Sequence, residues 1–285
     1  MRKGILEELN KSGISVTDMA NQSWCEYKVY LSCIEKEKPT KAMEKGTMIH
    51  RKLQKEVYKE LVVEPVTYPD VFYKNAYENI MTLKSLVENG KGRELKISGE
   101  IDGFTIRGQV DELMLQGEET VIIENKTSRN ENHKEMYGDV HSVQVMLYRL
   151  MFDDIISKRF TFKKYYDSNS VYRMKLSPQF IEGLRGIGIK DELIGIGTIC
   201  SNMFDAFYSI PKMSDRLMIR YMDQGGGFID EVEVNYDRQR LMKIIEKDMG
   251  FWKKEREPEP VRKEESWKCR HCYFLNKCKF GLSYV

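Results

Sequence analysis

The chain has no run of apolar residues that could cross a bilayer, and it has no internal repeats or low-complexity tracts. A transmembrane helix needs about 20 apolar residues in succession. The opening residues, MRKGILEELNKSG, carry acids where a secretory signal needs an apolar stretch. These absences predict an intracellular protein, cytoplasmic or, in a eukaryote, nuclear or mitochondrial, with no membrane partner.

The chain also has little net charge, because 46 Lys and Arg residues against 44 Asp and Glu residues leave only +2. A protein that binds nucleic acid by charge alone is strongly basic, so any contact with DNA here must use local patches. The 285 residues are 41% hydrophobic and 32% charged, which supplies both a core and a solvated surface. This composition excludes a disordered chain.

Three short segments rich in β-branched residues follow one another near the middle of the chain. They are LKISGEI (95–101), FTIRGQVDELML (104–115) and TVIIENKT (120–127). Turn formers separate them at Asp102-Gly103 and Gln116-Gly117. The pattern predicts a three-stranded meander.

Apolar residues at helical spacing predict helices over 23–33, 42–61, 73–89, 139–156 and 237–254. KRFTFKKYY (158–166) is typical of a further strand. The succession of strand, helix and strand predicts a right-handed crossover between parallel strands. RLMIRYMD and FIDEVEVNY flank residues 224–227 and predict a hairpin. The glycine-rich residues 181–200 predict no single element.

An acid lies in the second strand of the meander, and an acid and a lysine lie in the third: Asp111, then Glu124 and Lys126. Side chains alternate along a strand, so Glu124 and Lys126 share one face. Carboxylates on neighbouring strands suit Mg²⁺ or Mn²⁺, and a lysine beside them can position or help deprotonate a water. E-x-K alone is more typical of a surface ion pair, but Asp111 in the preceding strand favours a metal centre.

Three further residues can belong to this centre. His50 lies in the helix of residues 42–61, where a neutral imidazole can serve as an additional metal ligand, although a single histidine is more often structural. Gln144 and Tyr148 lie four residues apart on a later helix. Both therefore face one way and can reach a bound strand or the site itself.

The order G-x-x-x-H, G-Q-V-D-E, apolar-E-N-K-T and Q-x-x-x-Y resembles the RecB-like branch of the PD-(D/E)XK nucleases. The resemblance implies an α/β, restriction-endonuclease-like fold with a mixed central sheet flanked by helices. It implies four contacts to the metal, from His50, Asp111, Glu124 and the carbonyl of Asn125. It also implies that Lys126 is the catalytic lysine and that Gln144 and Tyr148 orient the substrate or the lysine.

Three of the six cysteines, Cys269, Cys272 and Cys278, lie close together near the C-terminus, and two more lie upstream, Cys25 and Cys33. Reducing compartments do not sustain disulfides, so the spacing indicates metal binding. Soft thiolates suit either Zn²⁺ or an iron-sulfur cluster, and both take four cysteines. The spacing does not decide between them.

SWKCRHCYFLNKC (266–278) resembles the end of exonuclease V. One upstream and three C-terminal cysteines also occur in the CRISPR-associated adaptation nuclease, and both families carry a structural [4Fe-4S] cluster. The resemblance implies four cluster ligands: Cys25, Cys269, Cys272 and Cys278. Cys33 competes for the upstream place, and Cys200 matches nothing. We expect a nuclease domain over 1–265, with its catalytic core at about 42–166, and a segment over 266–285 that closes the cluster site with Cys25.

The resemblance implies a metal-dependent DNA exonuclease that hydrolyses phosphodiester bonds at single-stranded ends, in repair or recombination. One alternative is a CRISPR adaptation nuclease that trims spacer precursors. Another is a non-catalytic DNA-binding or scaffold protein, which loss of an acid or the lysine would signal, and none is lost. Basic residues such as Arg107, Lys163 and Lys164 either line a groove for DNA or belong to the solvated surface.

Overall fold

A computed structural model describes residues 5–55, 61–127 and 133–281 of the chain. Within them the strands are β1 (Ile14–Ser15), β2 (Lys91–Ile101), β3 (Phe104–Gln116), β4 (Glu119–Thr127), β5 (Lys212–Met213), β6 (Arg216–Met222) and β7 (Phe228–Asn235). The α-helices are α1 (Val16–Ile34), α2 (Lys41–Lys55), α3 (Tyr68–Asn89), α4 (His133–Ile156), α5 (Phe162–Ser168), α6 (Pro178–Gly186), α7 (Ile196–Tyr208) and α8 (Arg238–Trp252). The 3-10 helices are η1 (Val171–Arg173), η2 (Asp191–Leu193), η3 (Lys263–His271) and η4 (Leu275–Lys277).

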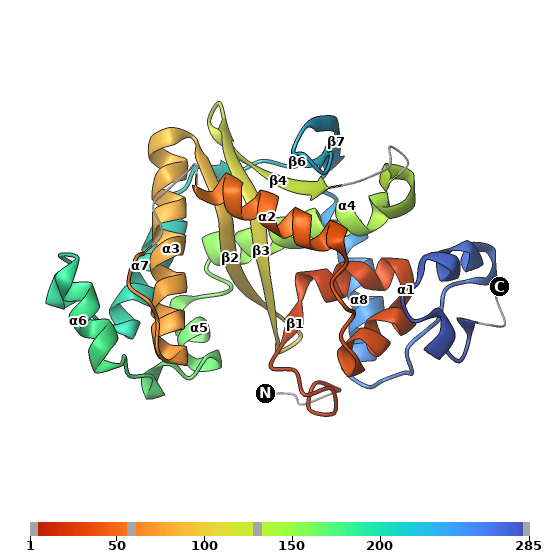
Figure 1. The fold of residues 1–285 in the computed structure, drawn as a ribbon, viewed down its shortest axis with the longest axis horizontal. Helices are drawn as coiled ribbons and strands as arrows, with labels where there is room; N and C mark the ends of the chain where they lie inside the picture. Colours follow the sequence, from red (N-terminus) through yellow and green to blue (C-terminus); the bar gives the residue numbers. More distant parts are fainter. Residues whose placement is uncertain (1–4, 56–60, 128–132, 282–285) are drawn as a thin grey trace.

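The described strands form one mixed sheet with helices around it (Figure 1). β2, β3 and β4 are antiparallel neighbours, which confirms the predicted meander. β4 pairs with β6 in parallel, and β6 pairs with β7 as the predicted antiparallel hairpin. The short strands β1 and β5 pair in parallel with β3 and β4. The protein therefore has the predicted mixed α/β architecture.

The strand predicted over 158–166 is wrong, because this segment contains the start of helix α5. Thr161 caps the helix by accepting a hydrogen bond from the backbone of Lys164 at 3.3 Å. The rings of Phe162 and Tyr165 then pack against Phe204 of α7, at centroid distances of 6.1 and 5.5 Å. The parallel partner of β4 is consequently β6, more than fifty residues further along the chain than the predicted strand.

The other predicted helices are confirmed, with shifted ends. α1 begins at Val16, before the predicted start, because Ser15 and Asp18 form a capping box there. α3 ends at Gly90, whose φ of 76° is the left-handed conformation that glycine adopts at no steric cost. Part of the predicted helix over 42–61 lies outside the described residues. The glycine-rich segment divides among α6, η2 and α7.

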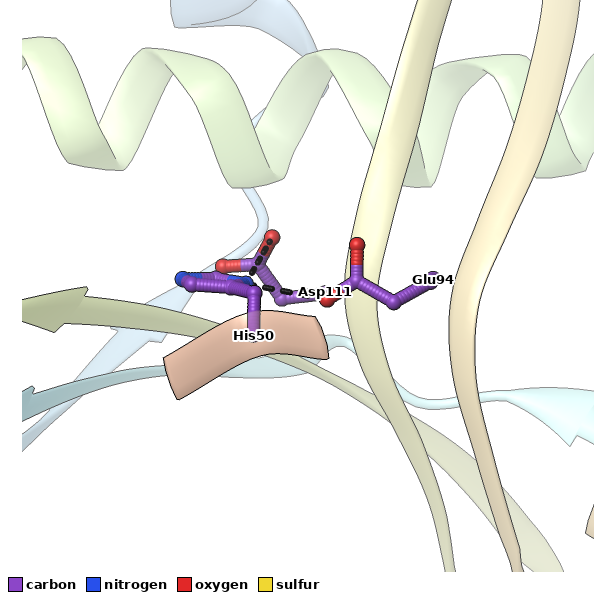
Figure 2. A group of neighbouring side chains, drawn as sticks. All are labelled: His50, Glu94 and Asp111. Carbon is purple, nitrogen blue, oxygen red and sulfur yellow. Dashed lines mark hydrogen bonds and ion pairs between the residues drawn. The ribbon is translucent and has the colours of Figure 1, made fainter. Parts of the chain in front are cut away.

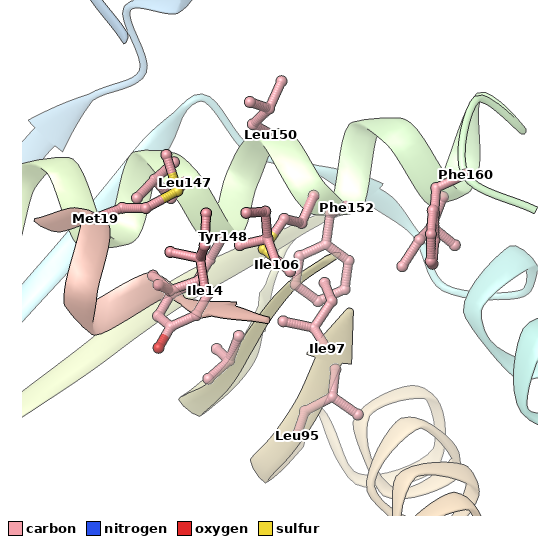
Figure 3. Close-up of a cluster of buried hydrophobic side chains, with 14 of the residues drawn as sticks. Ile14, Met19, Leu95, Ile97, Ile106, Leu147, Tyr148, Leu150, Phe152 and Phe160 are labelled. Atoms are coloured by element: carbon pink, nitrogen blue, oxygen red, sulfur yellow. The ribbon is translucent and has the colours of Figure 1, made fainter. Parts of the chain in front are cut away.

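The core lies between the sheet and α4 (Figure 3). Ile97 of β2 and Ile106 of β3 meet Phe152 of α4, and all three are almost fully buried. Burial of each such side chain contributes roughly 1.5–3 kcal/mol to folding. α4 is thereby fixed behind the sheet, so a polar residue near the middle of the helix, Gln144, meets the end of β4. In the part of the chain that the structure describes, no helix has both the length and the apolar character to span a bilayer.

The chain after α8 returns to α1 (Figure 1). The backbone N–H of Tyr27 donates to the carbonyl of Glu259 at 2.9 Å, and Arg256 donates to both carboxylate oxygens of Glu26. These contacts bring the C-terminal cysteines beside the N-terminal helix. The predicted domain boundary at residue 265 stays a prediction.

Candidate active site and cysteine cluster

Three acids lie at one level of three neighbouring strands: Glu94, Asp111 and Glu124. Pairs such as Leu95 with Val110 fix the register of β2 against β3 and place Glu94 opposite Asp111. The ladder between β3 and β4 ends at Glu112 and Ile123, so Glu124 is the next residue beyond it, on the Asp111 side. All three acids are at most 9% exposed. Such crowding of buried carboxylates is costly without positive charge between them.

His50 of α2 closes this centre next to Glu94 and Asp111 (Figure 2). Its Nδ1 lies 2.9 Å from Oε1 of Glu94 and 3.4 Å from Oδ1 of Asp111. Burial alone would lower the pKa of His50, but the hydrogen bond to Glu94 and the charges of Asp111, Glu94 and Glu124 outweigh it and raise the pKa to about 9. The predicted histidine therefore belongs to the centre.

Asp111 joins the centre to the backbone of β4. Its Oδ2 accepts a hydrogen bond from the backbone N–H of Asn125 at 2.8 Å, just where the two strands stop pairing. Burial, with the nearby charge of Glu124, raises the pKa of Asp111 well above its usual value. Oε2 of Glu124 is buried and has no hydrogen-bond partner within the described chain. The centre thus offers an unpaired carboxylate oxygen among crowded acids.

Lys126 is held between Glu124 and α4. Its Nζ donates to Oε1 of Glu124 at 2.7 Å and to Oε1 of Gln144 at 2.9 Å. Burial opposes the charge on Lys126, but the carboxylates of Glu124 and Asp111 raise its pKa above the usual value. The ammonium is therefore the form that this arrangement stabilises.

Gln144 and Tyr148 reach the site, as their spacing predicts. The amide of Gln144 donates to Oε1 of Glu124 at 2.7 Å and lies 3.3 Å from the hydroxyl of Tyr148. That hydroxyl donates to the backbone carbonyl of Gln109 at 2.8 Å. These hydrogen bonds form a chain in which Tyr148 orients Gln144. Through Gln144, α4 sets the positions of Glu124 and Lys126.

The sequence reasoning missed Glu94 and Gln109 as members of the site. The amide of Gln109 donates to Oε2 of Glu94, which leaves Oε1 for His50. Glu94 belongs to no sequence motif, but the register of the predicted hairpin indicates its position. Counting back through the hairpin from the predicted turn at Asp102 and Gly103 pairs residue 94 with residue 111.

The donor set fits a hard divalent cation. Mg²⁺ and Mn²⁺ prefer carboxylate oxygens, and imidazole is acceptable to Mn²⁺ as well. His50, Glu94 and Asp111 present ligand atoms that all lie within 4.8 Å of one another. The unpaired oxygen of Glu124 lies on the neighbouring strand. A protonated lysine next to such a group can hold a water or an anionic phosphate oxygen.

The four predicted cluster cysteines line one pocket, which α1, η3 and η4 enclose: Cys25, Cys269, Cys272 and Cys278. Cys25 has non-helical backbone angles inside α1, with φ at −167° and ψ at 112°. Its sulfur accepts a hydrogen bond from the backbone N–H of Lys28 at 3.4 Å. Burial raises the pKa of the thiol of Cys25, and Cys272 and Cys278 add to the effect.

The other two cysteines lie elsewhere. Cys33 lies near Lys11, whose Nζ is 3.7 Å from its sulfur, and it does not line the pocket. Cys200 is buried in α7 within the core. The geometry thus favours Cys25 for the upstream place. Trp267 packs edge-on against Trp24 at 5.4 Å, which agrees with a packing role for the aromatic residues around the cysteines.

The fold and the site together define an α/β protein with a buried centre of carboxylates, a lysine and a histidine, an arrangement that hydrolytic enzymes use. The chain belongs to the exonuclease V family. The family model, described as exonuclease V, a 5′ deoxyribonuclease, matches residues 6–139 and 192–280. These include every proposed site residue except Gln144 and Tyr148. Family membership makes the protein a DNA exonuclease.

Similar proteins agree with this placement. Exonuclease V of zebrafish (Danio rerio) is 26% identical over 294 residues, which cover 96% of this chain and 72% of that protein. The crystal structure of SSO0001 superposes with a TM-score of 0.44 at 14% identity, over 94% of this chain and 86% of that one. The latter likeness is too distant to carry an argument.

Proposed function

We propose that this exonuclease is metal-dependent and hydrolyses single-stranded DNA from an end, with the centre of Asp111, Glu124 and Lys126 as its active site. The observation that carries the proposal is the row of three buried acids. In it, one carboxylate oxygen of Glu124 is unpaired and the other accepts a hydrogen bond from Lys126. The family is described as a 5′ deoxyribonuclease, which supports action at the 5′ end. A PD-(D/E)XK, restriction-endonuclease-like fold and a role in DNA repair or recombination belong to the same proposal.

The metal would be held by Asp111 and Glu124 from the sheet, with His50 above them and the carbonyl of Asn125 beside them. Glu94, which belongs to no sequence motif, joins this set through its contact with His50. When bound, Mg²⁺ or Mn²⁺ would polarise the phosphodiester and lower the pKa of a water. His50 must lose its proton to serve as a ligand, so metal binding is coupled to proton release.

The protein's own groups then orient the reaction. Lys126, fixed by Glu124 and Gln144, presents its ammonium where it can hold the attacking water or a non-bridging phosphate oxygen. Gln144 is a positioning residue, because its contacts are with these side chains and with Tyr148. Tyr148 in turn anchors α4 to the backbone of β3.

The test is cleavage of single-stranded and duplex DNA, labelled at either end, with Mg²⁺, Mn²⁺ or EDTA. Glu124→Gln keeps the size of the side chain but weakens the metal site, so we expect cleavage to fall by at least about 100-fold while DNA binding stays. Glu118→Gln, an exposed acid outside the site, is the matched control. Cleavage by Glu124→Gln at the rate of the control would remove this residue from the mechanism.

We further propose that the four-cysteine pocket holds a structural [4Fe-4S] cluster. The pocket brings together four thiols from α1, η3 and η4, the number that either a cluster or Zn²⁺ needs. The resemblance of residues 266–278 to the end of exonuclease V favours the cluster over Zn²⁺.

The two alternatives are separated in different ways. A CRISPR adaptation nuclease would share the chemistry, and the family match favours exonuclease V over it. A non-catalytic scaffold would bind DNA but show no cutting with either metal when the cysteine site is intact. The cleavage assay therefore separates the scaffold from the enzyme directly.

A further inference from the structure

A groove beside the candidate active site has no assigned role. It has a volume of about 430 Å³, within the range of roughly 300–1,000 Å³ in which small-molecule pockets fall. Its walls come from α3, from β2 and β3, and from α5 and α7. We call it the strand groove, and its polar lining residues include Tyr68, Asn75, Lys96, Ser98, Arg107 and Gln109.

The strand groove adjoins the active site through Gln109 of β3. Gln109 lines the groove and also donates to Glu94 of the site. Alternate residues of β3 share a face, so Arg107, Gln109 and Asp111 follow one another along the same side of the sheet. Asp111 lies four residue steps along β3 from Arg107, about 13 Å, which a few nucleotides of a single strand can span.

Arg107 supplies positive charge that no acid neutralises. Its guanidinium donates to the hydroxyl of Ser12 at 2.9 Å and to the amide oxygen of Asn169 at 3.3 Å, and both partners are neutral. Within the described ranges, no carboxylate forms an ion pair with it. Two neutral acceptors thus orient a half-buried cation, and the remaining N–H groups can bind an anion.

The neighbouring lysines differ from Arg107. Lys163 is 82% exposed and pairs with Asp167, and Lys164 pairs with Glu100. Neither lines the groove. The solvated-surface interpretation therefore suits these two lysines, whereas Arg107 is built into the wall of a cavity.

The rim of the strand groove carries an exposed aromatic ring. Tyr68 is 65% exposed although it is a large side chain, and its ring lies 6.4 Å from that of Phe72 inside the groove. Tyr68 and Arg107 line one groove, and proteins bind single-stranded nucleic acid with this pair of residue types, because rings stack on bases and cations bind phosphates. Asn75 and Ser98 add polar groups at the same wall.

We propose that the strand groove binds the part of a single DNA strand next to the scissile phosphate, with Arg107 on a phosphate and Tyr68 stacked on a base. This inference rests on the proposed function, and it assigns to β3 a second role beyond carrying Asp111. The groove would fix the strand at a set distance from the acids and thereby place one phosphate at the active site.

The test measures binding of fluorescent single-stranded DNA to the full-length protein in the Glu124→Gln background, so that the DNA stays intact. Arg107→Gln should weaken binding about tenfold and lower the slope of log affinity against log salt by about 0.7, the value for one lost phosphate contact. Tyr68→Ala should weaken binding about tenfold with no change in that slope. Arg107→Lys keeps the charge and should retain most of the salt slope.

Two matched variants control for general effects. Arg185→Gln removes an exposed arginine that pairs with Asp191, and Tyr172→Ala removes an exposed tyrosine outside the groove. Neither should change affinity or slope. Affinity and slope for Arg107→Gln equal to those of Arg185→Gln would overturn the inference.

Cleavage by the otherwise wild-type protein separates the two proposals. Arg107→Gln should raise KM about tenfold and leave kcat at saturating DNA nearly unchanged. Cutting by the wild type with no change of KM in Arg107→Gln would refute the groove assignment and leave the nuclease proposal standing. Binding that depends on Arg107, without any cutting by the wild type, would support the groove as a DNA-binding site and refute the nuclease proposal.

Discussion

A buried carboxylate far from the acids of the sheet offers a quantitative test of the structure. Asp248 of α8 is only 5% exposed, and its Oδ2 is buried with no hydrogen-bond partner within the described chain. Its nearest acid, Glu26, is already paired with Arg256. Burial, and then the charge of Glu26, raise the pKa of Asp248 from its usual 3.8 to about 7.

The raised pKa makes the stability of the protein depend on pH. The folded state holds the proton on Asp248 more tightly than the unfolded state, so this contribution is fully present below pH 4 and is lost as pH rises towards 7. This rise in the pKa of Asp248 corresponds to roughly 4 kcal/mol of free energy of unfolding, at about 1.36 kcal/mol per pKa unit. Between pH 5 and pH 8.5 the protein loses about 2 to 3 kcal/mol of this contribution to its stability.

Asp248→Asn keeps the shape of the side chain and carries no charge at any pH. Relative to the wild type, its melting temperature should therefore rise with pH, by about 5 °C more at pH 8.5 than at pH 5. Thermal unfolding followed by circular dichroism at both values measures this, with the exposed Asp205→Asn as the control. The reasoning is refuted when the difference between Asp248→Asn and the wild type is the same at both pH values.

Three further predictions concern the site and the cysteine pocket. Cys25→Ser should lose the absorbance of an iron-sulfur cluster near 400 nm and unfold at a lower temperature, whereas Cys33→Ser should keep both; equal spectra would refute the ligand assignment. Gly108→Ala should destabilise the fold by about 1–3 kcal/mol in urea unfolding, because its Cβ would lie 2.5 Å from the ring of Tyr148; unchanged stability would contradict that contact. Gln144→Leu should lower kcat by about 10- to 100-fold with little change in KM, since it frees the lysine and the glutamate of the site; an unchanged kcat would argue against positioning.

The meander of β2, β3 and β4 was predictable because its determinants are local. β-Branched residues favour strands, and turn formers fix where each strand ends. Once the turns are known, the register follows by counting, and with it the meeting of Asp111 and Glu124. The same counting places Glu94 opposite Asp111, although Glu94 belongs to no sequence motif.

The errors lie where distant contacts decide the local structure. The aromatic residues from Phe160 to Tyr166 suit a strand as well as a helix, and packing against Phe204 of α7 selects the helix. β1 and β5 have two residues each, too few to show any period. The strand groove also escaped prediction, because its walls come from helices and strands that are far apart in the sequence.

The most direct test of the account is single-turnover cleavage of 5′-labelled single-stranded DNA by the wild type and by Lys126→Met. With Mg²⁺ or Mn²⁺ the wild type should release labelled products from the 5′ end, and EDTA should stop it. Lys126→Met should bind the DNA but cut it roughly 100- to 1,000-fold more slowly, because it loses the ammonium that Glu124 and Gln144 position. Cleavage by Lys126→Met at the wild-type rate, or cleavage that persists in EDTA, would contradict the proposed active site.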